Sequence, residues 1–388
     1  MDKITLIATL SFGLEAVVKR ELMALGFANI KASNGKVEFE ASTNDIPTAN
    51  LWLRSADRVL LKMAAFPAAT FDDLFEQTRA LPWESWITKD GKFTVTGKSV
   101  KSTLGSVRAC QSIVKKAVVE RLKEKYNTSW FEETGPGYII QVSILQDIAQ
   151  LTIDTSGSGL HKRGYRLQAG QAAIKETLAA ALVQLSFWNK DRLLIDPMCG
   201  SGTILIEAAM LARKIAPGLK KEFASEFWPN IPNNIWLQAR EAAHDAIDRD
   251  SQIIIYGYDI DNDMISASKA NAKQAGVKRD IIFSQRDIRE LWIDQQYGIV
   301  ISNPPYGIKL AELQDLNQIY ISMHKTFRKK KGWSVYILTA DKKFPDYFKR
   351  ATPDRVRKLY NGNIEVNYYQ YYGERPPRET KDHELGRS

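Results

Sequence analysis

The sequence predicts an α/β chain in which an α+β region precedes a mostly parallel, doubly wound sheet with helices on both faces. Three observations support this fold class. The chain has 388 residues, enough for two or three domains. Short apolar runs alternate with amphipathic helical periods in its first part. In its second half, β-branched runs end in Asp or Asn, and glycine turns or helical periods follow, as in β-α units.

The first 64 residues are predicted to form a ferredoxin-like α+β domain, because they show the order strand, helix, strand, strand, helix, strand. Asn34-Gly35 is a turn before one strand, and Gly26 is placed to end the first helix. The expected strands include 3–10, 37–40 and 58–63, and the expected helices are 14–25 and 46–52.

Residues 65–155 are predicted to form a second, more basic α+β domain. A Ser-, Thr- and Lys-rich turn precedes the basic amphipathic helix 108–126. The Lys and Arg side chains of this helix either form a solvated face or contact RNA phosphates. The other expected elements are a helix at 71–80 and strands at 93–98, 139–145 and 148–154. The candidate RNA-binding residues here are Lys98, Lys101, Arg108 and Lys115.

A Gly- and Ser-rich run, 155–159, begins a basic linker that extends over residues 156–166. This segment is either a solvated joint between domains or a second place where RNA phosphates are held. In the second case Tyr165 would stack on a base. The candidate residues are His161, Lys162, Arg163, Tyr165 and Arg166.

A strand, a glycine-rich turn and a helix occupy residues 193–213 and predict a ligand site. Gly200 and Gly202 permit positive φ and close approach of a ligand to the backbone, and the helix start offers free N–H groups. No Gly-Lys-Ser/Thr follows, so the turn is not a P-loop. The glycine spacing also departs from the dinucleotide fingerprint, which disfavours a nicotinamide-dependent oxidoreductase.

Three further strand ends carry polar side chains: Asp259 after 253–258, Asp287 after 281–286 and Asn303 after 299–302. Right-handed crossovers place these ends on one edge of the sheet, beside the glycine-rich turn. Asp259 suits the two hydroxyls of a ribose, and Asp287 suits the amino group of an adenine. The remaining expected elements are helices at 174–187, 264–275 and 342–350, a strand at 333–339, a hairpin at 355–372, a polar insertion at 217–249 and a disordered tail at 374–388.

The loop Asn303-Pro304-Pro305-Tyr306 is suited to a planar base with an exocyclic amine. The prolines stop the strand and restrict the backbone. The Asn303 side-chain oxygen and the Pro304 carbonyl would accept the two N–H groups, and Tyr306 would stack on the ring. Accepting both bonds would direct the nitrogen lone pair toward an electrophile. An ordinary strand-to-turn junction is the alternative interpretation.

This loop resembles the acceptor motif of class I methyltransferases that modify amino groups of nucleobases, and residues 196–203 resemble motif I of S-adenosylmethionine methyltransferases. The resemblance implies a Rossmann-like methyltransferase domain over 167–373 with S-adenosyl-L-methionine as cofactor. It implies catalytic roles for Asn303, Pro304, Pro305 and Tyr306. The implied cofactor-binding residues are Asp196, Pro197, Cys199, Gly200, Gly202, Thr203, Asp259, Ile260, Asp287 and Asn303.

The first half resembles a THUMP domain, an RNA-binding module. The whole chain resembles THUMP-containing methyltransferases once labelled N6-adenine-specific DNA methylases, and within them the bacterial large-subunit rRNA guanine-N2 methyltransferases. This implies transfer to guanine N2 of 23S rRNA, free or in an assembling ribosome. Ile308-Lys309 stand where that family has an acidic residue and an arginine. This departure bears on the substrate assignment more than on the chemistry. Adenine N6 of DNA or RNA, which the same loop would accept, remains open, and so does a non-catalytic RNA-binding protein with a relic fold.

Composition agrees with a polyanionic partner: 54 Lys and Arg oppose 45 Asp and Glu, giving a net charge of +9 and a pI near 9.2. Two separated cysteines and four scattered histidines predict neither a disulfide framework nor a metal site. Neither a signal peptide nor a membrane-spanning run is expected. The sequence therefore predicts a cytoplasmic protein that is a monomer or a weak homo-oligomer.

Overall fold

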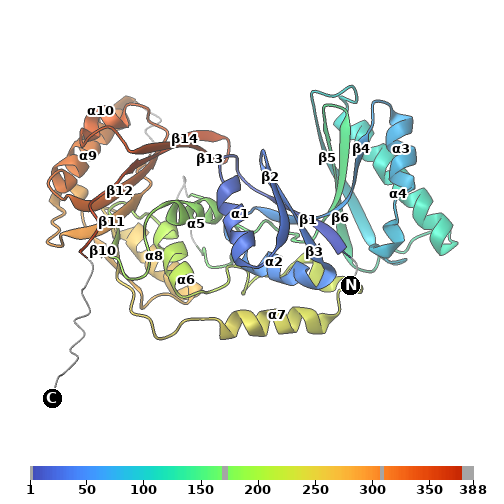
Figure 1. Cartoon of the computed structure of the whole chain (residues 1–388), viewed down its shortest axis with the longest axis horizontal. Coiled ribbons are helices and arrows are strands. Elements are labelled where there is room, and N and C mark those ends of the chain that lie inside the picture. The colour runs from blue at the N-terminus through green and yellow to red at the C-terminus, as the bar shows by residue number, and fades with distance from the viewer. Residues whose placement is uncertain (1–2, 168–173, 306–309, 378–388) are drawn as a thin grey trace, which may run out of the picture. The chain divides into compact units, whose positions relative to one another are not determined.

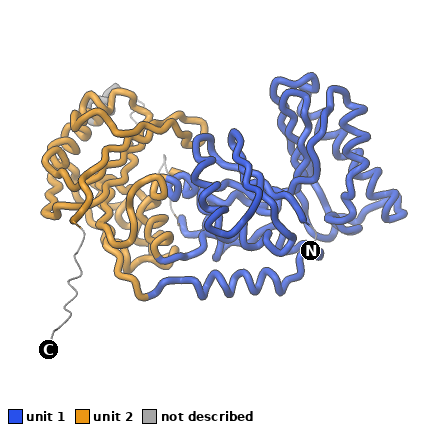
Figure 2. The backbone as a smooth tube through the Cα atoms, viewed as in Figure 1, with its two compact units in different colours: residues 1–166, 175–181, 213–249 blue, residues 167–174, 182–212, 250–388 orange. Residues whose placement is uncertain are grey.

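The computed structural model describes residues 3–167, 174–305 and 310–377, and the chain divides into two compact units (Figures 1 and 2). Unit 1 contains residues 1–166, 175–181 and 213–249, and unit 2 contains residues 167–174, 182–212 and 250–388. The insertion that precedes 250 therefore belongs with the first part of the chain, although it is flanked in sequence by the strands of unit 2.

Unit 1 contains a seven-stranded sheet in the order β2-β3-β1-β4-β7-β6-β5, in which only the β5–β6 pair is parallel among the described pairings. Its strands are β1 (Lys3–Thr9), β2 (Ala28–Ser33), β3 (Lys36–Ser42), β4 (Arg58–Pro67), β5 (Lys92–Val100), β6 (Gly137–Leu145) and β7 (Ile148–Asp154). Its helices are α1 (Glu15–Ala24), α2 (Ile46–Trp52), α3 (Phe71–Arg79), α4 (Val107–Tyr126) and α7 (Asn233–Asp245).

Strand β4 joins the two predicted α+β regions into this one sheet. Its first half pairs with β1, and Leu60 to Pro67 pair with β7 across a bulge between Lys62 and Ala64. The expected boundary between residues 64 and 65 thus falls inside a continuous strand. Apolar residues run through this strand, so both of its halves can be buried in one sheet.

The start of the predicted linker is packed rather than exposed. Thr155 and Ser156 are both fully buried. The Asn50 side-chain amide donates to the Thr155 hydroxyl at 2.9 Å, and the Ser156 hydroxyl donates to Asn50 Oδ1 at 2.6 Å. A Gly- and Ser-rich composition did not reveal this, because small polar side chains fit equally well in a flexible linker and in a hydrogen-bonded core.

Unit 2 contains a seven-stranded sheet in the order β10-β9-β8-β11-β12-β14-β13. The first five strands are parallel, and β14 runs antiparallel to β12 and β13. The strands are β8 (Leu194–Asp196), β9 (Ile255–Asp259), β10 (Ile281–Gln285), β11 (Tyr297–Ser302), β12 (Gly332–Thr339), β13 (Arg355–Asn361) and β14 (Ile364–Tyr371). The mostly parallel doubly wound sheet predicted from the sequence is confirmed.

Helices cover both faces of this sheet (Figure 1). On one face, Val335 and Ile337 of β12 lie in a buried cluster with Tyr320 and Phe344. On the other face, the ring of Tyr336 packs against Tyr368 with centroids 5.8 Å apart. The helices concerned are α5 (Glu176–Leu185), which begins in unit 1 and ends in unit 2, α6 (Thr203–Ala212), α8 (Asn262–Ala275), α9 (Leu310–Phe327) and α10 (Phe344–Phe348). Of these, α9 is not predicted by the sequence analysis.

Candidate active site

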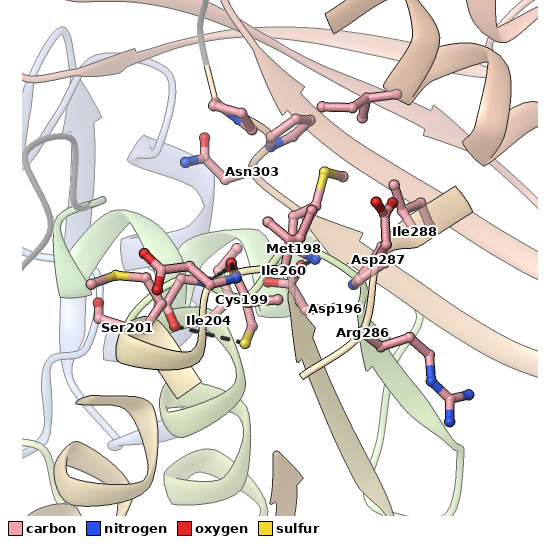
Figure 3. Close-up of a pocket in the computed structure, with 18 of the residues that line it drawn as sticks. Asp196, Met198, Cys199, Ser201, Ile204, Ile260, Arg286, Asp287, Ile288 and Asn303 are labelled. Atoms are coloured by element: carbon pink, nitrogen blue, oxygen red, sulfur yellow. Dashed lines mark hydrogen bonds between the residues drawn. The ribbon is translucent and has the colours of Figure 1, made fainter. Parts of the chain in front are cut away.

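A cavity of about 620 Å³ lies at the carboxyl ends of β8, β9, β10 and β11 (Figure 3). This is the edge of an open α/β sheet where ligands bind, and the volume is in the usual range for a small-molecule site. The lining residues are Ile174, Asp196, Pro197, Met198, Cys199, Gly200, Ser201, Thr203, Ile204, Asp259, Ile260, Asp261, Met264, Arg286, Asp287, Ile288, Arg289, Asn303, Pro304, Pro305, Gln318 and Ile319.

The turn between β8 and α6 uses glycine for two different reasons. Both Gly200 and Gly202 have positive φ, +51° and +81°. A Cβ on Gly202 would lie 3.0 Å from Phe283 and from Ser268, so this glycine lets the turn pack against β10 and α8. A Cβ on Gly200 would meet nothing within 4 Å, so this glycine leaves open space beside the cavity. A ligand can therefore approach the backbone at Gly200.

Asp259 at the end of β9 holds the glycine turn in place. One carboxylate oxygen accepts a hydrogen bond from the Gly200 N–H at 2.8 Å, and the other accepts one from the Asp261 N–H at 3.0 Å. A carboxylate has about four acceptor positions, so two remain for a ligand. The predicted role, accepting the hydroxyls of a ribose, is compatible with this geometry.

Asp196 at the end of β8 is buried, with 2% of its surface exposed. Its Oδ1 accepts hydrogen bonds from the Ser302 hydroxyl at 2.7 Å and from the Met198 N–H at 3.1 Å. Burial raises the pKa of Asp196 to about 7, and the charge of Asp259 also raises it, against the lowering effect of the two hydrogen bonds. This carboxyl group therefore changes protonation near neutral pH.

Asp287, after β10, is engaged by a neighbouring cation. Its Oδ1 accepts from the Arg289 N–H at 2.8 Å, and its Oδ2 accepts from the Arg289 guanidinium, with Nε at 2.7 Å. These hydrogen bonds lower the pKa of Asp287. The carboxylate is thus ionised and partly occupied, and an adenine amino group would share it with Arg289.

Cys199 lies in the cofactor turn but is poorly suited to act as a nucleophile. Its side chain is 8% exposed, and burial raises the pKa of its thiol, so the reactive thiolate is disfavoured. Its backbone N–H donates to the Tyr258 carbonyl at 2.8 Å. The residue therefore packs the turn against β9.

Asn303 and the two prolines follow β11 directly and line the same cavity. Asn303 is half-buried, Pro304 is buried and Pro305 is exposed. Figure 3 shows Asn303 on the loop that leaves β11 and Asp287 on the loop after β10, with Met198 drawn between them in this view. Tyr306, the fourth predicted catalytic residue, lies outside the described residues.

Of the predicted cofactor-binding residues, only Gly202 is not among those that line the cavity. Sequence reasoning missed eleven lining residues, both apolar and polar. Met198, Ile204 and Ile288 are close in sequence to predicted residues, and their positions beside the turns were an available signal. Gln318 and Ile319 come from α9, and nothing in the local sequence marks them. The residues missed in this way are Ile174, Met198, Ser201, Ile204, Asp261, Met264, Arg286, Ile288, Arg289, Gln318 and Ile319.

The predicted RNA-binding residues divide into two groups. The first group is exposed and contains Lys162 together with four basic residues between 98 and 115. Arg163 and Tyr165 are 3% and 2% exposed, and the Arg163 guanidinium donates to the carbonyls of Leu160 and Arg54. The expectation that these two side chains contact RNA is therefore corrected: both are buried. The four exposed basic residues between 98 and 115 are Lys98, Lys101, Arg108 and Lys115.

The remaining two candidates in the basic linker, His161 and Arg166, are also poorly placed to bind a phosphate. Burial lowers the pKa of His161, so its ring is neutral near pH 7 and adds no charge for a phosphate. The Arg166 guanidinium pairs with Glu176 at 3.2 Å. The local sequence could not distinguish buried from exposed cations, because each long side chain can bury its stem or its charge.

Two structural absences hold for the described part of the chain. No group of three or more His, Cys, Asp or Glu side chains there is arranged to hold a metal ion. None of its helices combines the length and the apolar character that crossing a bilayer requires.

The strand order, the glycine turn after β8 and the carboxylates after β9 and β10 together define a class I S-adenosylmethionine-dependent methyltransferase. A model of the family described as RMKL-like, methyltransferase domain, matches residues 163–370, and the chain belongs to this family. Models of the RlmL ferredoxin-like domain and of the THUMP domain match residues 5–60 and 68–154.

Similar proteins cover nearly the whole chain. A Bacillus subtilis protein named "Putative RNA methyltransferase YpsC" is 47% identical over 98% of this chain and 99% of its own length. A crystal structure from Listeria monocytogenes, described as a predicted N6-adenine-specific DNA methylase, is 47% identical, covers 96% of this chain and 97% of that one, and has a TM-score of 0.92. The structure of SMU.472 with S-adenosylhomocysteine is 40% identical, covers 97% and 100%, and also has a TM-score of 0.92.

Longer relatives match only in part. A Cellvibrio japonicus protein named ribosomal RNA large subunit methyltransferase K/L is 32% identical over 91% of this chain. The match spans 49% of that protein, so the chain corresponds to about half of its length.

Proposed function

We propose that this protein transfers a methyl group from S-adenosylmethionine to the exocyclic amine of a base in RNA, and that the base is a guanine, methylated at N2, in 23S rRNA. One observation carries the proposal. The Asn303-Pro304 segment, with its acceptor oxygens, lines the same cavity as the glycine turn and Asp259. A bound methyl donor and a bound base amine would therefore be neighbours.

The cavity fits the cofactor by its chemistry. Gly200 leaves room at the backbone, Asp259 keeps two acceptor positions, and Ile204, Ile260 and Ile288 supply apolar surface for a flat ring. When bound, S-adenosylmethionine supplies an electrophilic methyl group on a sulfonium centre. The start of α6 and the loop around Gly200 would hold its methionine part, and Asp259 its ribose.

On the acceptor side, the Asn303 side-chain oxygen and the Pro304 carbonyl would accept the two amine protons. This fixes the nitrogen lone pair toward the methyl group, and Tyr306 would stack on the base. Positioning supplies most of the rate increase in such a reaction, because the donor is already activated. A base in a duplex must first leave its stack, which costs a few kcal/mol.

Three observations favour RNA as the substrate class. The chain contains a THUMP domain match, relatives over most of its length are named RNA methyltransferases, and its net charge is +9. Lys98, Lys101 and Arg108 are exposed and available to phosphates. Large-subunit rRNA is suggested by the names of the K/L relatives, of which the chain spans about half.

Adenine N6, in RNA or DNA, is the second candidate. The Asn-Pro-Pro loop would accept either amine, and the Listeria structure is described as a predicted N6-adenine-specific DNA methylase. Mass spectrometry of rRNA nucleosides from cells with and without the protein distinguishes the two. Loss of N2-methylguanosine without the protein supports the proposal, whereas loss of N6-methyladenosine alone identifies the second candidate.

A non-catalytic protein with a relic fold is tested separately. Calorimetric titration with S-adenosylhomocysteine should show binding to one site, and purified protein should transfer labelled methyl groups to unmodified 23S rRNA but not to duplex DNA. Absence of both binding and transfer would identify the relic. Transfer to DNA alone would identify a DNA methyltransferase.

A further inference from the structure

A group of cations and one exposed tryptophan lie on unit 2 at the edge of the sheet opposite the cofactor cavity. Arg328, Lys329, Lys330 and Lys331 are consecutive, and they connect α9 to β12. We call these four residues together with Trp292 the distal basic patch. Gly332, the next residue, pairs with Tyr297 at the start of β11, whereas the cavity lies beyond Ser302 at its end. Five residue steps along a strand correspond to about 17 Å.

The cations of the patch are available to an external anion. Arg328, Lys329 and Lys331 are exposed, and within the described chain none of the three is in an ion pair. Three acidic residues lie near this run, Asp294, Asp354 and Glu374. Asp294 accepts a hydrogen bond from the Trp292 indole, and Asp354 accepts one from the Tyr372 N–H at 2.7 Å. A hydrogen bond from a neutral N–H leaves a carboxylate charged, but among the described residues no direct ion pair neutralises a cation of the patch.

Trp292 makes the patch more than a run of solvated cations. Its side chain is 76% exposed, although a tryptophan normally buries its large apolar surface. The Lys330 ammonium lies 5.9 Å from the ring centroid and donates to the Ile293 carbonyl, so the indole and the basic run belong to one surface. Exposed aromatic rings beside Lys and Arg are the usual elements of a nucleic-acid contact, where the ring stacks on a base and the cations hold phosphates.

The backbone that carries these cations is held in place. The Arg350 guanidinium donates to the carbonyls of Trp333 at 2.6 Å and Lys330 at 3.3 Å. The Lys331 carbonyl accepts from the Glu374 N–H at 2.8 Å. A helix C-terminus alone favours nearby cations, which accounts for a charge at 328 but not for an exposed indole beside the run.

We infer that the distal basic patch is a second RNA-binding surface, which holds phosphates and one unstacked base of the substrate RNA away from the reacting base. This inference rests on the proposed RNA substrate. A large folded RNA can contact both edges of the domain, and the distal contact adds affinity without taking part in methyl transfer.

The test compares two charge-matched triple variants of the full chain. The patch variant carries Arg328→Gln, Lys329→Gln and Lys331→Gln, and leaves Lys330 beside Trp292. The control carries Lys269→Gln, Lys273→Gln and Lys278→Gln, three exposed cations on or just after α8. Binding of unmodified 23S rRNA transcript is measured by filter retention between about 50 and 200 mM salt.

The patch variant should bind at least about tenfold more weakly, and the slope of log affinity against log salt should fall by about two to three. The control should keep the slope of the unmodified protein. A separate Trp292→Ala variant should lose about tenfold in affinity with an unchanged slope, because stacking involves no counterion release. S-adenosylhomocysteine titration should be unchanged in all three.

The outcomes for this surface and for the proposed activity are separable. Equal slopes for the patch variant and the control, or no measurable binding of RNA by the unmodified protein, overturn the inference. A third outcome would also overturn it: the unmodified protein binds anionic phospholipid vesicles, and the patch variant loses this vesicle binding but keeps its affinity for RNA. RNA binding that depends on the patch, without any methyl transfer to rRNA, would instead preserve the surface and contradict the proposed activity.

Discussion

The Ser302 hydroxyl donates a hydrogen bond to Asp196 Oδ1 at 2.7 Å, and both side chains are buried. Ser302 immediately precedes Asn303, and Asp196 immediately precedes the glycine-rich turn. The bond therefore ties the loop proposed to hold the base to the loop proposed to hold the cofactor, through the ends of two adjacent strands, β11 and β8.

Ser302→Ala should destabilise the protein, because Asp196 loses a buried hydrogen-bond donor. A loss of about 1–3 kcal/mol in the free energy of unfolding is expected at pH 8, measured by urea denaturation. The pKa of Asp196 should rise further, since this hydrogen bond lowers it. Ser284→Ala in β10 removes a half-buried strand hydroxyl as a control and should change stability much less. Equal effects would show that the Ser302–Asp196 bond contributes nothing specific.

Asp196 should make stability depend on pH. Its folded pKa, about 7, lies above the value of about 3.9 for an unfolded chain, so the folded protein binds the proton more tightly. The stability contributed by the protonated form is present below pH 4 and is lost as pH rises to about 7. Asp196→Asn keeps an acceptor for Ser302 and removes the titration. Its unfolding free energy relative to the unmodified, cofactor-free protein should increase by about 2.5 kcal/mol between pH 5 and pH 8. A pH-independent difference would contradict the assigned pKa.

Asn303→Ala should abolish methyl transfer while leaving the affinity for S-adenosylhomocysteine nearly unchanged, because the lost oxygen is assigned to the base. Labelled methyl uptake by rRNA and calorimetric titration measure the two effects. Asn303→Asp keeps an acceptor oxygen at the same place and should retain part of the activity. Loss of cofactor binding in the alanine variant would mean that Asn303 acts on the donor instead.

Asp259→Ala should weaken cofactor binding about tenfold or more, since hydrogen bonds to a charged group contribute about 1.5–3 kcal/mol each. The variant also removes the acceptor that holds the Gly200 N–H. Asp263→Ala, on an exposed residue at the start of α8 that does not line the cavity, is the control. An unchanged titration for the Asp259 variant would show that the ribose contact is misplaced.

The two glycines of the cofactor turn should differ on substitution by alanine. Both adopt positive φ, but only at Gly202 would the new methyl group lie 3.0 Å from buried neighbours, Phe283 and Ser268. Gly202→Ala should therefore lower the free energy of unfolding more than Gly200→Ala does, by about 1–3 kcal/mol. Gly200→Ala should mainly reduce cofactor affinity, because its methyl group points into open space beside the cavity. Thermal denaturation and titration of both variants test this contrast.

The elements around the site are predictable because their signals are local. Asp196, the glycines after it and the helical apolar pattern that begins at 203 lie within a few residues of one another. Each of them sets the backbone conformation of its own segment. The same holds for Gly276, which adopts φ +85° and ends α8, and for Asn361-Gly362, which turns β13 into β14. The predicted helices and strands at these places agree with the structure.

The features that sequence reasoning missed depend on distant partners. Strand β4 is shared by two pairings, with β1 and with β7, and no local pattern distinguishes one strand with two neighbours from two separate strands. The buried face of α9 becomes clear only in the tertiary structure, where Tyr320 lies in one cluster with Val335 of β12 and its ring contacts Phe344 of α10. The buried state of Arg163 likewise depends on a segment outside the basic run, because its guanidinium donates to the Arg54 carbonyl.

The sequence by itself determined the class of fold, the order of its β-α units and the type of chemistry at each strand end, because turns, glycines and apolar periods act over a few residues. Only the tertiary structure decided which charged groups are paired, buried or exposed, and which side chains of α9 close the cavity. The physical reason is that burial and charge pairing depend on distances between segments far apart in the chain, whereas backbone geometry is set by neighbouring residues.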